Sequence, residues 1–324
     1  MRQGLCYNIV TVDETSRKVF DRSRLKLLPL SQREHRFHVS QMVPLSVRPS
    51  ETSLAAVRDV AGWIMEARWR EKPIIWFIGG HVIKNGLSRH LIRLIQDGWV
   101  THLAMNGSAA IHDWEIALVG GTSEYVQTNL ERGEFGLWQE TGHLCNAIRD
   151  DEHQYSDAGC GKLIGRYIGG NCPPHMQSSV LAYACWHKTP VTVHISIGQD
   201  VLHMHPNFDG RAWGHASHMD FLQLAHGVSQ LDGGGVFLNF GSAVAGPEVF
   251  LKALSMARNV VRQDEQDVKD FYTAVFDIVP LPENCTRVVP DESDAGYYFR
   301  PWKSLLVRTV LPGNSRYVRL RHEE

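Results

Sequence analysis

The 324-residue sequence lacks most of the short motifs that indicate a function. No GxGxxG turn follows its clearest strand pattern, and it contains neither a P-loop motif nor a GxSxG nucleophile motif. Its six cysteines are scattered without a CxxC pair, so we interpret them as reduced thiols and not as a disulfide framework. Nucleophilic hydrolysis and P-loop chemistry therefore have no support.

Strong charge and long apolar runs are also missing. The formal net charge is −2 and no basic block occurs, so we expect no nucleic-acid partner. No run approaches the roughly 18 apolar residues that cross a bilayer, and residues 1–18 lack the apolar core of a signal peptide. We therefore expect a cytoplasmic protein with no membrane partner.

The most informative segment is residues 72–123. Residues 73–78 and 100–105 are typical of buried strands, and the residues between them have helical spacing. Such a strand–helix–strand unit is parallel and right-handed. Gly79-Gly80 and Asn106-Gly107 follow the two strands, at the carboxyl edge where ligands approach a parallel sheet. Small residues there let a backbone come close to a ligand, so the sequence predicts a nucleotide site.

The alternation of strands and helices continues to about residue 260 and predicts an α/β fold. We expect one large Rossmann-like domain with a parallel sheet over residues 51–265, preceded by an N-terminal arm, residues 1–50. Residues 266–324 are predicted to form a C-terminal extension. Ser304–Val310 and Tyr317–Leu320 alternate as strands do, and the Pro312-Gly313-Asn314 turn between them predicts a β-hairpin.

Polar residues follow the second predicted strand at the start of a helix, from Asn106 to Glu115. Backbone N–H groups and the helix dipole at such a position favour an anion, a ribose or a phosphate. His112, Asp113 and Glu115 lie in the first helical turns. The alternative is that the two carboxylates only complement the helix dipole while His112 packs on the sheet.

A histidine-rich segment extends from His194 to His218. On an extended chain His203 and His205 point the same way and can share a metal with Asp200 or Asp209. The spacing fits no structural zinc pattern, so substrate binding, proton transfer and structural packing are also open.

A third segment runs from Gly233 through a strand to Gly241-Ser242 and a helix. It is either a second wall of a cleft or an ordinary strand–helix connection. Among the lysines, only Lys84 lies at the expected ligand edge. Imine chemistry needs such an amine.

Residues 73–260 resemble two related families. Gly79-Gly80, Asn106, His112-Asp113 and Gly121-Thr122-Ser123 follow in the order seen in the NAD-binding domain of LOR/SDH-type ornithine cyclodeaminases. The layout also resembles deoxyhypusine synthase, in the stretches 190–200 and 233–236. The resemblance implies a deoxyhypusine synthase-like fold, NAD as cofactor and an assembly of two or four subunits.

The chain departs from these families in two ways. Deoxyhypusine synthase has an imine-forming lysine just after its Gly-Gly-Gly-Val strand start, where this chain has Phe237, Leu238 and Asn239. These 324 residues also contain no match to the amino-terminal arginine-handling domain that often accompanies the cyclodeaminase type, so we expect a different arrangement from that type. The same deoxyhypusine reaction is therefore not expected.

These observations together predict an NAD-dependent enzyme that acts on a small amine, amino acid or polyamine. Transient oxidation to an imine would be followed by return of the hydride. The expected catalytic or substrate-binding residues are His112, Glu115, Asp200, His203, His205 and Lys84. The expected cofactor-binding residues, with no metal, are Gly79, Gly80, Asn106, Gly107, Ser108, Asp113, Gly234, Gly241 and Ser242. The alternatives are a metal-dependent hydrolase or lyase that uses His203, His205 and Asp200, and a non-catalytic nucleotide-binding module.

Overall fold

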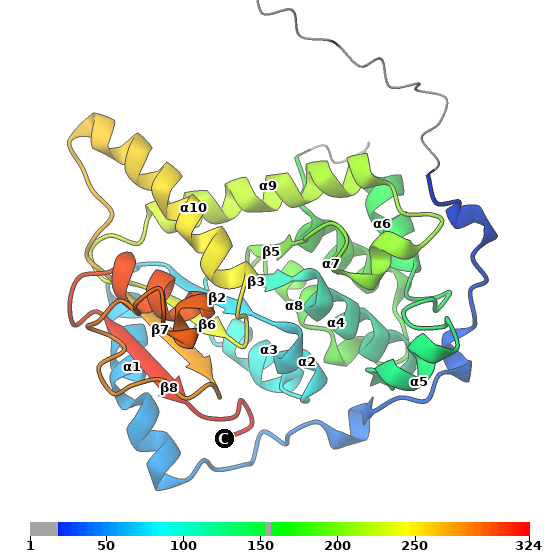
Figure 1. The fold of residues 1–324 in the computed structure, drawn as a ribbon, viewed down its shortest axis with the longest axis horizontal. Helices are drawn as coiled ribbons and strands as arrows, with labels where there is room; N and C mark the ends of the chain where they lie inside the picture. The colour runs from blue at the N-terminus through cyan, green and yellow to red at the C-terminus, as the bar shows by residue number, and fades with distance from the viewer. Residues whose placement is uncertain (1–18, 153–156) are drawn as a thin grey trace, which may run out of the picture.

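The centre of the protein is a six-stranded parallel sheet, seen in a computed structural model that describes residues 19–152 and 157–324 (Figure 1). The strand order is β5-β3-β2-β6-β7-β8, and every neighbouring pair is parallel. The predicted α/β class is confirmed. The strands are β2 (Ile74–Ile78), β3 (His102–Asn106), β5 (Val191–His194), β6 (Gly235–Phe240), β7 (Phe271–Asp277) and β8 (Ser315–Arg319).

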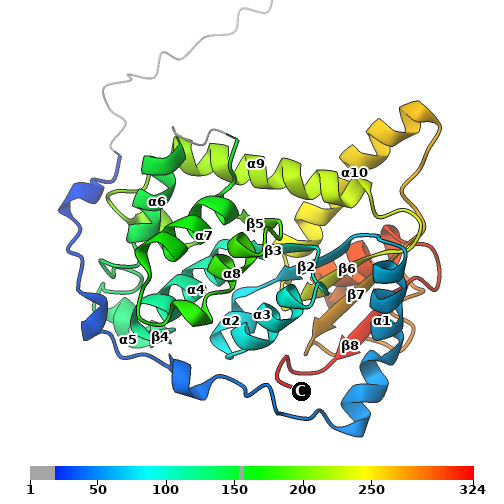
Figure 2. The same ribbon diagram turned by 180° about the vertical axis from the view of Figure 1, so that it is seen from behind.

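Apolar residues on both sides of the strands explain why helices cover both faces of the sheet. In β2, Ile74 and Ile78 face one side, whereas Ile75 and Phe77 face the other, and all four are fully buried. Figures 1 and 2 show helices in front of the sheet and behind it.

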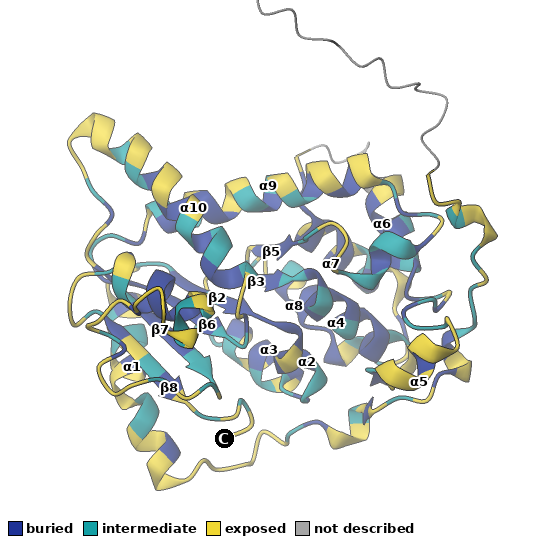
Figure 3. Ribbon diagram, in the orientation of Figure 1, coloured by how far each residue is buried: buried dark blue, intermediate teal, exposed yellow. Residues whose placement is uncertain are grey.

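One face of the sheet packs against α9, α10 and the short helix Trp302–Arg308, and the other packs against the remaining large helices. Exposed residues gather on the outer sides of α9 and α10 (Figure 3). No helix in the described ranges is long and apolar enough to cross a membrane. The helices are α1 (Glu51–Trp69), α2 (Gly80–Lys84), α3 (Ser88–Gln96), α4 (Gly107–Val119), α5 (Val126–Glu131), α6 (His143–Glu152), α7 (Cys160–Asn171), α8 (Val180–Trp186), α9 (Gly210–Ser229) and α10 (Ala245–Val261).

The order of the strands locates the expected ligand edge. Numbered along the chain, the sheet reads third, second, first, fourth, fifth and sixth, which is the order of doubly wound dinucleotide-binding sheets. The direction of winding reverses between β2 and β6. In such sheets ligands bind outside the carboxyl ends of the two strands at this switch point.

The arm before α1 runs along one side of the domain (Figure 1). Its first 18 residues, with Cys6, lie outside the described part of the chain. Strand β1 (Phe37–His38) of the arm pairs with β4 (Gly121–Thr122), and Leu28 bridges to Trp138. The arm is therefore anchored to the domain just after α4.

The predicted C-terminal hairpin is wrong. Residues Trp302–Arg308 form a helix of the π type, and Tyr317 lies in β8, which pairs in parallel with β7. The hairpin is excluded because its first predicted strand is helical and its second pairs with β7. Leu305 and Leu306 are both fully buried within this helix.

Candidate functional site

The ends of β2 and β6 meet at the switch point. A Cβ atom placed on Gly79 would overlap the carbonyl oxygen of Gly241, and it would lie 2.9 Å from the carbonyl carbon. The amide of Gly79 donates to the carbonyl of Phe240 at 2.8 Å. Gly241 has a φ of 60°, which favours glycine. The two glycines therefore let the strand ends approach as closely as their backbones allow.

The same edge continues from β2 to β3 and on to β5. A Cβ on Gly80 would overlap the Ser108 hydroxyl and would lie 3.1 Å from the His112 ring. A Cβ on Gly107 would overlap the Asp200 carboxylate. The predicted residues at three strand ends thus form one continuous band.

A cavity of about 250 Å³ opens beside this band, over α4 and the β5–α9 connection. Five of its lining residues were predicted as site residues from the sequence, namely Lys84, Ser108, His112, Glu115 and Asp200. The other lining side chains include Arg33, Glu124, Phe135 and Trp138. The cavity therefore combines basic, acidic and aromatic groups.

Burial shifts the pKa values of three ionisable groups of the cavity. It raises the pKa of the Asp200 carboxyl to about 6. It lowers the pKa of His112 to about 4, and burial followed by the charge of Arg36 lowers the pKa of Lys84. Perturbed groups that gather in one cavity are typical of catalytic or binding sites.

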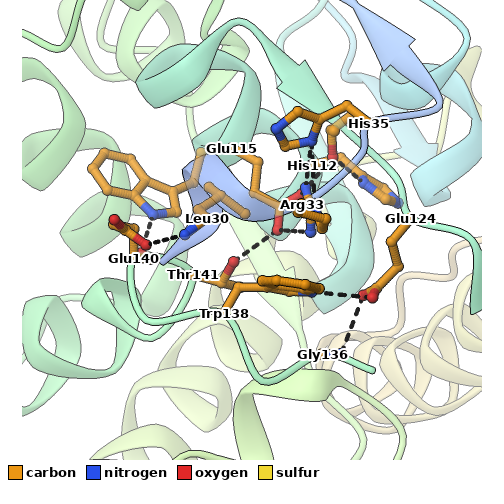
Figure 4. Close-up of polar contacts among 12 residues, drawn as sticks. Leu30, Arg33, His35, His112, Glu115, Glu124, Gly136, Trp138, Glu140 and Thr141 are labelled. Carbon is orange, nitrogen blue, oxygen red and sulfur yellow. Dashed lines mark hydrogen bonds and ion pairs between the residues drawn. The ribbon is translucent and has the colours of Figure 1, made fainter. Parts of the chain in front are cut away.

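A buried ion pair forms one wall of the cavity (Figure 4). The Arg33 guanidinium donates to both oxygens of Glu115, at 2.8 and 2.7 Å. Thr141 and Thr122 donate to the same carboxylate, at 2.8 and 2.6 Å. Arg33 also lies over the ring of Trp138, 5.7 Å from its centre.

This network keeps Glu115 ionised. Burial alone raises the pKa of a carboxyl, but the charge and hydrogen bonds of Arg33 outweigh it and lower the pKa of Glu115. Both oxygens already accept two hydrogen bonds each. The Glu115 carboxylate is therefore held in place by four hydrogen bonds, and its predicted catalytic or substrate-binding role stays a prediction.

Sequence reasoning missed the partners of Glu115. Arg33 comes from the arm, 82 residues away, and no local spacing connects the two. Glu124 was also missed, although it accepts hydrogen bonds from Asn129, Trp138 and the Gly136 amide (Figure 4). Of the residues that contact Glu115, only Thr122 lies in a segment that the sequence analysis identified, Gly121-Thr122-Ser123.

Three predicted residues cap helices. Asp113 is fully buried and accepts from the Ser179 hydroxyl and from the first amides of α8, so it does not face the cavity. Burial raises the pKa of Asp113 to about 6. The side chains of Asn106 and Ser242 accept from amides at the starts of α4 and α10. Asn106 and Ser242 still lie at the strand ends.

Gly234, His203 and His205 are placed away from the cavity. Gly234 precedes β6 and therefore lies at the opposite, amino edge of the sheet. Residues 201–204 form a 3-10 turn, so the two imidazoles do not share a side as they would on a strand. His203 accepts from the Gly198 amide, and the buried His205 contacts the carbonyl of Gly136. Among the described residues no group of three His, Cys, Asp or Glu side chains is arranged to hold a metal.

A second cavity, of about 260 Å³, lies on the sheet face beside the switch point. Trp76, Ile78 and Phe240 form its floor, and the C-terminal residues His322 to Glu324 close one side. The His322 ring comes within 2.5 Å of where a Cβ on Gly241 would lie. His322 therefore occupies space directly beside the glycine ends.

No family model and no curated protein matches this chain. Similar solved structures include the complex of AgrE with ornithine and NAD+, which is 19% identical, with a TM-score of 0.46. The alignment covers 81% of this chain but 32% of AgrE, so the chain spans about a third of that protein.

Two further structures belong to the families that the sequence resembles. A provisionally assigned LOR/SDH protein from Methanococcus maripaludis S2 is 15% identical, with a TM-score of 0.48, over 87% of this chain and 70% of that one. A provisionally assigned deoxyhypusine synthase from Entamoeba histolytica is 10% identical, with a TM-score of 0.36, over 60% and 72%. Likeness at this level concerns the fold alone, and no activity is transferred from it.

Proposed function

We propose that this chain is an NAD-dependent enzyme that acts on a small amine or amino acid. The observation that carries the proposal is the close approach of Gly79 and Gly241 at the switch point of a sheet with the dinucleotide-binding strand order. Neither position has room for a side chain, so only backbone atoms border the strand ends that a dinucleotide would approach. Gly80 and Gly107 continue this surface toward the cavity.

The cavity supplies the chemistry that such a substrate needs. Lys84 is a cation at its wall, and Asp200 is an acid whose pKa of about 6 lets it hold or release a proton near neutral pH. An amino acid carries one group of each sign, and the aromatic rings of Phe135 and Trp138 suit its carbon chain.

NAD, when bound, would accept a hydride from the carbon that bears the substrate amine and later return it. Residues at the glycine ends would hold the dinucleotide. His112 and Asp200 would remove and return protons at the substrate, and Lys84 would bind the carboxylate. Lys84 is also the amine available if a covalent imine forms. A homodimer or homotetramer is part of this proposal.

The metal-dependent alternative is less well supported, because Asp200 lines the cavity whereas His203 and His205 are engaged elsewhere. The non-catalytic nucleotide-binding alternative shares the same glycine ends. It differs from the proposal only in predicting no turnover.

Mass spectrometry of small molecules released by heating the purified protein is the first test, followed by calorimetric titration with NAD, NADP and ADP-ribose. The expected result is binding of NAD or NADP. Binding of neither dinucleotide at millimolar concentration would overturn the proposal.

Two variants sharpen this test. Asn106→Asp keeps the cap of α4, because Asp caps as well as Asn, but it adds a negative charge where phosphates would approach. We expect it to weaken NAD binding, whereas Asn171→Asp, at the exposed C-terminal end of α7, leaves binding unchanged. Lys84→Met distinguishes the proposed enzyme from a non-catalytic binding module. With amines and amino acids tested as substrates, we expect this variant to bind NAD as the wild type does but to lose turnover.

A further inference from the structure

A chain of hydrogen bonds links His112 to the arm. The His112 Nδ1 lies 2.8 Å from the Thr122 hydroxyl, and that hydroxyl lies 2.6 Å from a Glu115 oxygen. Glu115 in turn pairs with Arg33. His112 and Glu115 lie three residues apart on α4, so they share a face of the helix.

The direction of these hydrogen bonds follows from the donors available. Glu115 is ionised and only accepts, so the single proton of the Thr122 hydroxyl points to Glu115. The Thr122 oxygen is then an acceptor toward His112, and Nδ1 must carry a proton to donate to it. An unprotonated Nδ1 would set two acceptors 2.8 Å apart. The neutral ring therefore carries its proton on Nδ1 and a lone pair on Nε2.

The other side of the ring belongs to the cavity. His112 lines it together with Lys84, Ser108 and Asp200, and no described residue forms a hydrogen bond with Nε2. Burial is the main cause that lowers the pKa of His112 to about 4, with smaller effects of Lys84, Arg33 and His81 in the same direction and of Glu115 against it. The imidazole is therefore neutral at pH 7.

We infer that His112 is the general base of the cavity and that Thr122, Glu115 and Arg33 form a positioning chain that fixes its Nδ1–H tautomer. The role as base rests on the proposed function, whereas the tautomer does not. In serine proteases an aspartate holds a histidine in one tautomer directly. Here the carboxylate acts through a hydroxyl.

Two contacts from the N-terminal arm hold the positioning chain in place. Arg33 neutralises Glu115, and β1 pairs with β4 at the register Phe37↔Thr122, which places the Thr122 backbone. The arm is therefore part of the catalytic apparatus, and the site is incomplete without it.

Nitrogen-15 NMR of protein with labelled histidine tests the tautomer, with His112→Gln to assign the signal. We expect His112 Nε2 without a proton near pH 7. A protonated Nε2 would overturn the inference, even if NAD binds and turns over. Conversely, failure to bind NAD would end the proposed function but leave the tautomer result standing.

A matched pair of variants tests the chain. Thr122 and Thr141 are both fully buried and both donate to Glu115, but only Thr122 contacts His112. Thr122→Val should move the proton to Nε2 and lower kcat about 10–100-fold with little change in KM. Thr141→Val should leave the tautomer unchanged. Thr122→Ser should retain both the Nδ1–H tautomer and the wild-type kcat.

Equal effects of Thr122→Val and Thr141→Val on the His112 signal would contradict the positioning chain. Should Thr122→Val fail to fold, the wild-type signal and Thr122→Ser still decide: a Thr122→Ser variant that folds and loses the Nδ1–H tautomer counts against the chain.

Discussion

Gly79 lies against the carbonyl group of Gly241, so the two strand ends at the switch point are separated by backbone atoms alone. Backbone cannot move aside as a flexible side chain can. Gly79→Ala should therefore destabilise the fold by about 1–3 kcal/mol, the usual range for overpacking. Denaturant unfolding measures this change.

Gly62 is the matched control, because it lies on exposed α1 with nothing within 4 Å of an added Cβ. Gly62→Ala should raise stability by about 0.5–1 kcal/mol through its helix preference. If Gly79→Ala were as stable as wild type, the strand ends would be farther apart than described.

Arg33 and Glu115 form a pair whose side chains are each 3% exposed, so removing one partner leaves a buried charge. Arg33→Met should cost about 3–5 kcal/mol. It should also free the arm, so that limited proteolysis cuts before residue 50. The exposed pair of Arg93 with Asp97 is the control, and Arg93→Met should leave stability and proteolysis unchanged.

The same pair makes stability depend on pH. Because the pKa of Glu115 is lower in the folded state than its ordinary 4.5, its carboxylate stabilises the fold above that pH. The contribution is lost as pH falls through the folded pKa. Glu115→Gln should therefore flatten the acid limb of a stability–pH profile, and an unaltered acid limb would contradict the buried pair.

The sequence predicted the band of strand ends because the relevant signals are local. Gly79 and Asn106 each follow directly on a run of buried strand residues, and that pattern locates the edge without any tertiary information. The Arg33–Glu115 pair could not be predicted, since it joins the arm to α4 and depends on how the arm crosses the domain.

Two predictions were wrong because a local sequence pattern was interpreted as an extended strand with a nearby partner. The proposed pairing of His203 with His205 assumed an extended chain, but a 3-10 turn changes the directions of both side chains. The hairpin assumed that Tyr317 pairs with its sequence neighbours, whereas β8 pairs with β7, about forty residues earlier. Short polar–apolar alternation does not identify a strand's partner.

Asp220 should make the protein less stable as pH rises. Its carboxyl is fully buried and accepts from the Gly161 and Val193 amides with one oxygen, while the other oxygen has no described partner. Burial raises its pKa from 3.8 to about 8. Between these values the unfolded chain releases the proton and the folded chain keeps it, so stability falls with increasing pH.

Asp220→Asn keeps an oxygen for both amides and removes the ionisation. We expect its free energy of unfolding to vary less between pH 5 and 8 than that of the wild type, measured by urea unfolding. A slope identical to wild type would show that Asp220 is ionised throughout.

The His322 ring borders the glycine ends, since it lies 2.5 Å from the position of a Cβ on Gly241. A dinucleotide that contacts Gly241 must displace this ring, and the displacement reduces the observed affinity. His322→Ala should therefore lower the Kd for NAD several-fold in a calorimetric titration. His226→Ala is the control, since His226 lines a cavity at the opposite edge of the sheet, beside Pro73 and Thr101. An unchanged Kd in His322→Ala would mean that the dinucleotide does not pass over Gly241, and the cofactor contacts would then have to be sought nearer Gly80 and Gly107.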